Sequence, residues 1–177
     1  MRRRSTHSNR GIGLEKMITL FGARYMSSGE AYLIKHEPPV KHLKSLKFGQ
    51  FVAVRQAKGQ PDYMLLFNGN SVLFDAKEFG GKRFPFSSLH SHQFNALMAF
   101  ERSGGYSALF LRSTDVNGYF VLPLSAFKLQ YMNWDRCRQI GNKSKKGQAS
   151  ISLTFIKENA IQWDENGYLA AVSMLFG

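Results

Sequence analysis

Asn68-Gly69 lies between two apolar runs, residues 63–67 and 71–74, and constrains the fold of this chain more than any other feature. Both residues of an Asn-Gly pair can adopt positive φ, which makes the pair the strongest short signal for a two-residue hairpin turn. We therefore expect two antiparallel strands around the turn, with Phe67 opposite Asn70 and paired residue numbers that sum to 137.

The predicted hairpin brings three charged residues together. In this register Asp62 faces Asp75, with their Cβ atoms about 4.5–5.5 Å apart. Lys77 lies two residues beyond Asp75 and shares its face, because side chains alternate along a strand. If the turn were Gly69-Asn70, Asp62 would face Lys77 and Asp75 would be diagonal to it. The three groups converge in either register.

Two carboxylates held this close repel each other and need a cation or a shared proton. Hard oxygen ligands suit Mg²⁺ or Mn²⁺, and a water bound to such an ion is a usable nucleophile near neutral pH. Lys77 could orient that water or stabilise the charge that develops on a phosphate. The alternative is an ordinary hairpin with the charges on its solvated face, because an isolated D…DxK pattern is common by chance.

The charge balance favours a polyanionic partner. Lys and Arg number 24 against 12 Asp and Glu, which gives a formal net charge of +12. Such an excess is typical of proteins that bind nucleic acid or another anionic surface. The predicted DNA-binding residues form an N-terminal arm, a central basic segment and a pair after the hairpin: Arg2, Arg3, Arg4, Arg10, Lys41, Lys44, Lys47, Arg55, Lys58, Lys82 and Arg83. A further patch comprises Arg136, Arg138, Lys143, Lys145 and Lys146.

Composition and short motifs exclude several other classes. With 177 residues we expect a single domain spanning residues 1–177, with 1–10 as a flexible basic arm. No apolar run reaches the roughly 18 residues of a membrane span, and no secretory signal is evident. Cys137 is the only cysteine, which points to a reducing cytoplasm. Gly80-Gly81-Lys82 lacks the spacing of a phosphate-binding loop, so we expect no nucleotide cofactor.

Periodicity predicts helices packed on a mixed sheet. A helix begins at Gly13, with Leu14, Met17, Ile18 and Phe21 on one face, and a second, capped by Ser87 or Ser88, ends at Gly104-Gly105. We expect strands at 31–35, 106–111, 118–122 and 151–156, a short helix near 125–132, and a last helical or apolar element at 167–176. Residues from about 36 to 58 lack clear periodicity and are predicted to project as an insertion.

Two further sets of polar residues have alternative interpretations. Glu15 is either a first-turn acid favoured by the helix dipole or an additional carboxylate that reaches the metal. His90 and His92 at the start of the second helix are expected to point in different directions. That arrangement makes a poor zinc site, and we expect helix capping or DNA contact instead.

The order and spacing of these motifs resemble the RecU-type Holliday junction resolvases of the PD-(D/E)xK nuclease superfamily. The residues that carry the resemblance, strongest between Asn9 and Leu111, are Asn9-Arg10-Gly11 with Leu14-Glu15, Tyr32 to Pro38 with the basic insertion, Pro61-Asp62-Tyr63, Phe74-Asp75-Ala76-Lys77-Glu78, and Phe84-Pro85 with Leu89 and His90-Ser91-His92-Gln93. The chain departs from many relatives in having Asp75 where they have Glu.

The resemblance implies a restriction-endonuclease-like α/β core, a mixed sheet flanked by helices, with residues 36–58 as a protruding basic stalk. It implies a homodimer whose two sites make paired symmetric nicks in four-way DNA junctions, leaving 5′-phosphate and 3′-hydroxyl ends. Asp62, Asp75, Glu15 and the Ala76 carbonyl carry over as ligands of Mg²⁺, with Mn²⁺ as a substitute. Lys77 carries over as the catalytic lysine and Gln93 as a glutamine near the site. The alternatives are another repair or restriction nuclease of the superfamily and a non-catalytic branched-DNA binder.

Overall fold

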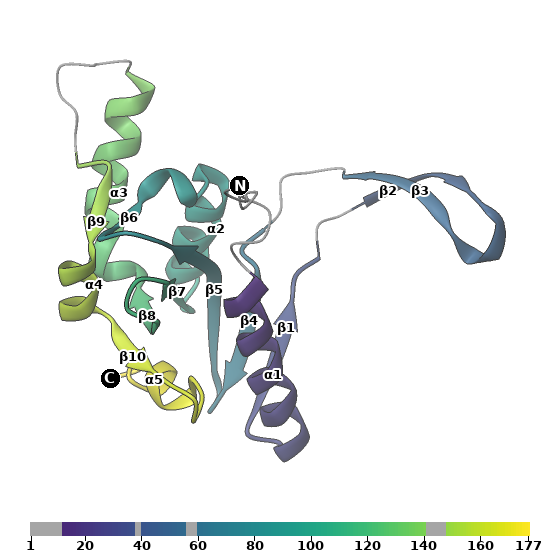
Figure 1. The fold of residues 1–177 in the computed structure, drawn as a ribbon, viewed down its shortest axis with the longest axis horizontal. Coiled ribbons are helices and arrows are strands. Elements are labelled where there is room, and N and C mark those ends of the chain that lie inside the picture. The colour runs from purple at the N-terminus through teal and green to yellow at the C-terminus, as the bar shows by residue number, and fades with distance from the viewer. Residues whose placement is uncertain (1–11, 38–39, 56–59, 141–147) are drawn as a thin grey trace, which may run out of the picture.

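A six-stranded mixed sheet forms the centre of the protein, in the order β1-β4-β5-β7-β8-β10 (Figure 1). The computed structural model describes residues 12–37, 40–55, 60–140 and 148–177. The strands of the central sheet are β1 (Ala31–Lys35), β4 (Tyr63–Phe67), β5 (Asn70–Phe79), β7 (Tyr106–Ser113), β8 (Gly118–Pro123) and β10 (Ile161–Trp163). Only β5 and β7 pair in parallel, and α2 (Ser91–Arg102) connects them, as a parallel crossover requires. The predicted mixed sheet is confirmed.

Helices cover both faces of this sheet. On one face α1 (Ile12–Ser28) and α5 (Leu169–Ser173) pack against side chains that include Phe74 and Phe110. On the other, α2, α3 (Leu124–Gln139) and α4 (Leu153–Asn159) pack against side chains that include Leu109 and Leu111. Successive residues of β5 alternate between the faces, so Phe74 faces α1 and Asp75 faces α2.

The first predicted helix is confirmed as α1. Leu14, Ile18 and Phe21 are buried on the stripe predicted from their spacing, and Met17 packs at its edge. Gly22 lets the helix lie close to β1, because a Cβ at this position would stand 2.2 Å from Cδ2 of Leu33. The start of α1 is thereby brought near the end of β1.

A separate two-stranded hairpin extends away from the sheet and helices (Figure 1). It consists of β2 (Val40–Ser45) and β3 (Phe51–Arg55), joined through a 3₁₀ turn at Lys47–Gly49. Its described side chains are exposed, except for the partly buried Ala53. The hairpin falls within the segment that was expected to project.

Several elements differ from expectation. The predicted strand over residues 151–156 is wrong: a three-residue strand, β9 (Ser150–Ser152), pairs with β6 (Arg83–Pro85), and α4 follows at once. The helix predicted near 125–132 is longer and forms α3, whereas β10 was not predicted. The last element contains α5, as expected. Among the described residues, no helix is long and apolar enough to cross a lipid bilayer.

Candidate active site

The hairpin formed by β4 and β5 has the predicted register. Asn68 and Gly69 both have positive φ, at 50° and 74°, and Phe67 pairs with Asn70. The ladder ends at the pair Tyr63 and Phe74, one position before Asp62. Oδ2 of Asp62 instead accepts a hydrogen bond of 2.9 Å from the backbone N–H of Ala76. The carboxylate of Asp62 is therefore tied directly to the strand that carries Asp75.

Asp75 is fully buried between a hydrogen-bond donor, Gln93, and a cation, Lys77. Nε2 of Gln93 donates a 2.6 Å hydrogen bond to Oδ1, while the Lys77 ammonium contacts Oδ2 in an ion pair. Burial raises the pKa of Asp75 to about 7; the positive charge of Lys77 opposes this shift and the nearby Asp62 carboxylate adds to it. At neutral pH this carboxyl group is therefore poised between its protonated and ionised forms.

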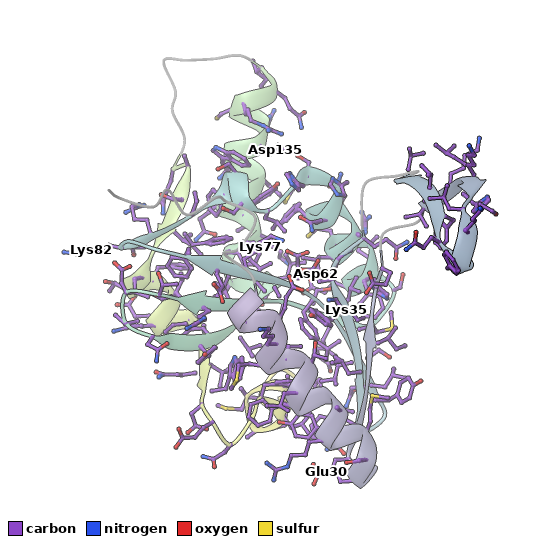
Figure 2. The ribbon with its side chains drawn as sticks, turned by 45° about the vertical axis from the view of Figure 1, so that its right-hand side comes forward. Glu30, Lys35, Asp62, Lys77, Lys82 and Asp135 are labelled. Atoms are coloured by element: carbon purple, nitrogen blue, oxygen red, sulfur yellow. The ribbon has the colours of Figure 1, made fainter. Side chains whose placement is uncertain are left out.

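Lys77 lies on β5 with Asp75, and its ammonium group is placed between the carboxylates of Asp75 and Asp62. Its ammonium contacts Asp75 and lies 4.0 Å from Oδ2 of Asp62, and a fifth of its side chain remains exposed. Burial lowers the pKa of Lys77, but the charges of Asp75 and Asp62 outweigh burial and raise the pKa above its usual value. Lys77 is thus a cation at neutral pH, and Figure 2 shows it close to Asp62 near the middle of the molecule.

Gln93 is held in place by its own helix. It is the third residue of α2, and its Oε1 accepts a 3.1 Å hydrogen bond from the backbone N–H of His90, which forms the N-cap. The cap predicted at Ser87 or Ser88 is therefore wrong, because those residues lie in a preceding 3₁₀ turn. The rings of His90 and His92 stack with centroids 5.4 Å apart, so the expectation that they point in different directions is also wrong.

Glu15 lies near the site but is paired elsewhere. It enters from α1, on the sheet face opposite α2, and its Oε2 lies 3.2 Å from Nζ of Lys35. Its charge still contributes to the raised pKa of Lys77. Within the part of the chain that the structure describes, no three or more His, Cys, Asp or Glu side chains are grouped so that they could hold a metal ion. Asp62 and Asp75 are the two carboxylates that converge.

The residues that converge nevertheless fit a hard divalent cation. Oδ2 of Asp75 is buried and accepts no hydrogen bond of good geometry, although the Lys77 ammonium touches it. A second carboxylate beside it, on Asp62, supplies another oxygen of the type that Mg²⁺ prefers. Since Mg²⁺ keeps several waters and uses one or two carboxylates, this pair is a sufficient protein contribution.

The described basic residues are distributed over distant surfaces. Lys41, Lys44 and Lys47 are exposed on the projecting hairpin. Lys82 lies at the opposite side of the molecule from that hairpin (Figure 2), and Arg83 beside it bonds to Ser150 through two nitrogens, at 2.7 and 2.9 Å. Arg136 and Arg138 are exposed on α3. Arg2, Arg3, Arg4, Arg10, Lys58, Lys143, Lys145, Lys146 and the side chain of Arg55 lie outside the described residues.

The sequence did not predict the supporting roles of two residues, Glu78 and His36. Oε1 of Glu78 accepts hydrogen bonds from the backbone N–H of Leu14, at 2.7 Å, and from Arg112, at 3.0 Å, and so fixes the start of α1. His36 bonds to the backbone on both sides of Asp62. Neither role has a signal in the local sequence, although Glu78 directly follows Lys77.

Comparison with known proteins identifies the family of this chain. The RecU family profile, described as Recombination protein U, matches residues 9–175, well beyond the stretch that carried the resemblance most strongly. The Holliday junction resolvase RecU of Oenococcus oeni is 29% identical over 96% of this chain and 87% of its own length. The RecU of Staphylococcus carnosus is 31% identical over 78% and 68%.

A solved structure, the Holliday junction resolvase Hjc of Archaeoglobus fulgidus, aligns with 84% of this chain and 94% of its own at a TM-score of 0.46 and 9% identity. Similarity at this level does not establish a shared function. The family assignment follows from the profile and from the identity to the curated relatives. On those two findings, the chain belongs to the RecU family of recombination proteins.

Proposed function

We propose that this protein is a Holliday junction resolvase, a metal-dependent endonuclease that nicks four-way DNA junctions. The observation that carries the proposal is the fully buried Asp75 carboxylate, held by Lys77 and Gln93 beside Asp62. Evolution of a stable core alone would not favour a buried acid with a pKa near neutrality, and such groups cluster at functional sites. The relatives named as resolvases support the choice of substrate.

Asp62 and Asp75 would hold Mg²⁺, or Mn²⁺ in its place, with the Ala76 carbonyl and Glu15 as further candidates. When bound, the ion supplies Lewis-acid activation of the phosphate and lowers the pKa of an attacking water. Lys77 stays charged and stabilises negative charge as it develops on the phosphate oxygens. Gln93 keeps Oδ1 of Asp75 oriented through its 2.6 Å hydrogen bond. In-line attack leaves a 5′-phosphate and a 3′-hydroxyl.

The charge distribution supports DNA as the polyanion. The chain carries a net charge of +12, and Lys41, Lys44 and Lys47 project on a hairpin away from the site. Contacts of this kind bind phosphates without reading sequence, so selectivity for a junction would come from its shape. A homodimer of single-domain subunits, each with one site and residues 36–58 as a stalk, would place two sites on one junction and nick strands of like polarity.

Two other functions compete with this proposal. A repair or restriction nuclease of the same superfamily would use the same carboxylates but would cut flaps or linear duplex. A non-catalytic branched-DNA binder would have no need for the arrangement of Asp62, Asp75 and Lys77. The intact site argues against the binder, and the RecU membership argues against the other nucleases.

The site is tested by Asp75→Asn in a nicking assay on a four-way junction. We expect Mg²⁺-dependent nicking to be lost while binding to the junction, measured in EDTA, is retained. Asp164→Asn is the matched control, because Asp164 is an exposed acid in the turn after β10 and makes only local bonds. Cutting by Asp75→Asn at the wild-type rate would mean that the metal assignment is wrong.

A further inference from the structure

His36 makes two hydrogen bonds to the chain around Asp62. Its backbone N–H donates to the carbonyl oxygen of Asp62 at 2.8 Å, and its ring nitrogen Nδ1 lies 2.7 Å from the carbonyl oxygen of Pro61. These two carbonyls belong to the peptide groups on either side of the Asp62 Cα. Fixing both peptide planes fixes φ and ψ of Asp62, and therefore the direction in which its side chain leaves the backbone.

These two bonds hold Asp62 at a position where the strand ladders of the sheet have ended. The ladders of β4 with its two neighbours end at Tyr63, which pairs with Lys35 on one side and with Phe74 on the other. Asp62 lies one residue beyond both ladders, and Pro61 before it has no backbone N–H to donate. The backbone bond of His36 continues the register of β1, and its imidazole adds a side-chain contact to the carbonyl oxygen of Pro61.

The acceptor, the carbonyl oxygen of Pro61, determines which nitrogen of the His36 imidazole carries the proton. A carbonyl oxygen can only accept a hydrogen bond, so Nδ1 of His36 must carry the proton. The ring is half-buried and Pro61 is buried, so water competes poorly for this bond. At the other end of Asp62, the backbone N–H of Ala76 holds Oδ2 at 2.9 Å. Asp62 is thus held at its backbone by His36 and at its carboxylate by Ala76.

We propose that His36 is a positioning residue for the metal site, whose imidazole sets the angle at which Asp62 presents its carboxylate beside Asp75 and Lys77. Ligating groups must be held within about 0.5 Å of their productive geometry, and loss of a group that orients a ligand typically weakens metal binding by about 10–100-fold. The proposal rests on the proposed function to the extent that Asp62 is a metal ligand.

The test compares three substitutions at this position. His36→Ala removes the ring donor. In His36→Asn the side-chain amide nitrogen can occupy the place of Nδ1, whereas His36→Gln carries the same amide one bond further out and cannot reach Pro61 in the same way. His42→Ala is the matched control, because His42 is an exposed histidine whose ring bonds only to Ser45 and packs near Phe51.

The first readout is the affinity of the DNA-free protein for Mn²⁺, measured by electron paramagnetic resonance. We expect His36→Ala and His36→Gln to bind Mn²⁺ about 10–100-fold more weakly than wild type, and His36→Asn and His42→Ala to bind within about threefold of it. The second readout is the nicking rate at saturating metal. There the His36 variants should regain most of the rate that they lose at low metal concentration. If His36→Ala fails to fold, the Asn and Gln variants, which both carry an amide, decide the matter.

The outcomes separate this inference from the proposed function. Equal Mn²⁺ affinity in wild type, His36→Ala and His36→Gln overturns the positioning role even if all of them cut junctions. If His36→Asn binds Mn²⁺ as weakly as His36→Gln, the positioning role is also overturned. The hydrogen bond to Pro61 would then not determine the affinity for Mn²⁺. A selective loss in Ala and Gln supports the role, even if the wild type were to cut no junction.

Discussion

Nε2 of Gln93 donates a 2.6 Å hydrogen bond to Oδ1 of Asp75 inside the protein core, where the carboxylate has no exposure to solvent. The other end of the same amide accepts from the backbone of His90, so the donor cannot turn away. A helix start thereby supports a group on a neighbouring strand. The hydrogen bond from Gln93 favours the ionised form of Asp75, whereas burial alone would favour its neutral form.

Removing this donor should make Asp75 harder to ionise. In Gln93→Ala the buried oxygen loses a partner, a change that costs on the order of 1–3 kcal/mol. The pKa of Asp75 then rises further, so nicking at neutral pH should fall by about 10–100-fold and recover partly at higher pH. A single-turnover pH profile measures this, with Asn95→Ala, an exposed residue on the same helix, as control. A lower rate with an unshifted profile would contradict the interpretation.

Metal affinity should depend on pH through the same residue. Burial raises the pKa of Asp75 to about 7, and a cation must displace the remaining proton before it can bind. Apparent Mn²⁺ affinity should therefore fall as pH drops below about 7, approaching tenfold per pH unit, and level off above it. Calorimetric titrations with Mn²⁺ between pH 5.5 and 8.5 measure whether the affinity falls with decreasing pH, as expected. Affinity that does not change over this range would mean that Asp75 is not a ligand.

Lys35 forms an ion pair with the carboxylate of Glu15, which we proposed as a further candidate ligand of the metal. Since Nζ of Lys35 lies 3.2 Å from Oε2, Glu15 must leave this pair to reach a metal. If it does, Glu15→Gln weakens Mn²⁺ binding, and Lys35→Gln strengthens it by releasing the acid. Exposed pairs of this type contribute at most about 1 kcal/mol, so the gain in Lys35→Gln should stay below about fivefold. Unchanged affinity in Glu15→Gln would remove Glu15 from the metal shell.

The projecting hairpin should contribute to DNA affinity through phosphates. Replacing Lys41, Lys44 and Lys47 by Gln removes three exposed charges. Each lost phosphate contact lowers the slope of log affinity against log salt by about 0.9, so the slope should fall by up to about 2.7. Junction binding in EDTA at several salt concentrations measures it. Arg24→Gln with Lys157→Gln, exposed on α1 and α4, should leave the slope close to the wild-type value.

Local patterns predicted the parts of the site that depend on local structure. The Asn68-Gly69 turn fixed the register that carries Asp75 and Lys77, because turn geometry and strand alternation act over a few residues. The helix over Leu14 and Phe21 followed from its spacing in the same way. The pairing of Glu15 with Lys35 and the hydrogen bonds of His36 join segments distant in sequence, and no local pattern records them.

The errors have equally local causes. Residues 151–156 resemble a strand because all of them except Ser152 are apolar or β-branched. Oγ of Ser152, however, accepts a hydrogen bond from the backbone N–H of Phe155 at 3.0 Å and caps the start of α4. Ser87 and Ser88 suggest a cap for the second helix because Ser is a common N-cap residue. His90 and Gln93 form the capping box instead, with Gln93 at the position that this motif requires.

Paired nicking of four-way junctions by this site can be measured by mapping cuts on a set of DNA substrates. Immobile and mobile junctions, a flap and a linear duplex are incubated with the protein, with and without Mg²⁺, and cuts are mapped on every strand. We expect Mg²⁺-dependent nicks on two opposed strands of like polarity in the junctions, each with a 5′-phosphate, and little cutting of the duplex. Equal cutting of all substrates, or no cutting with Mg²⁺, would contradict it.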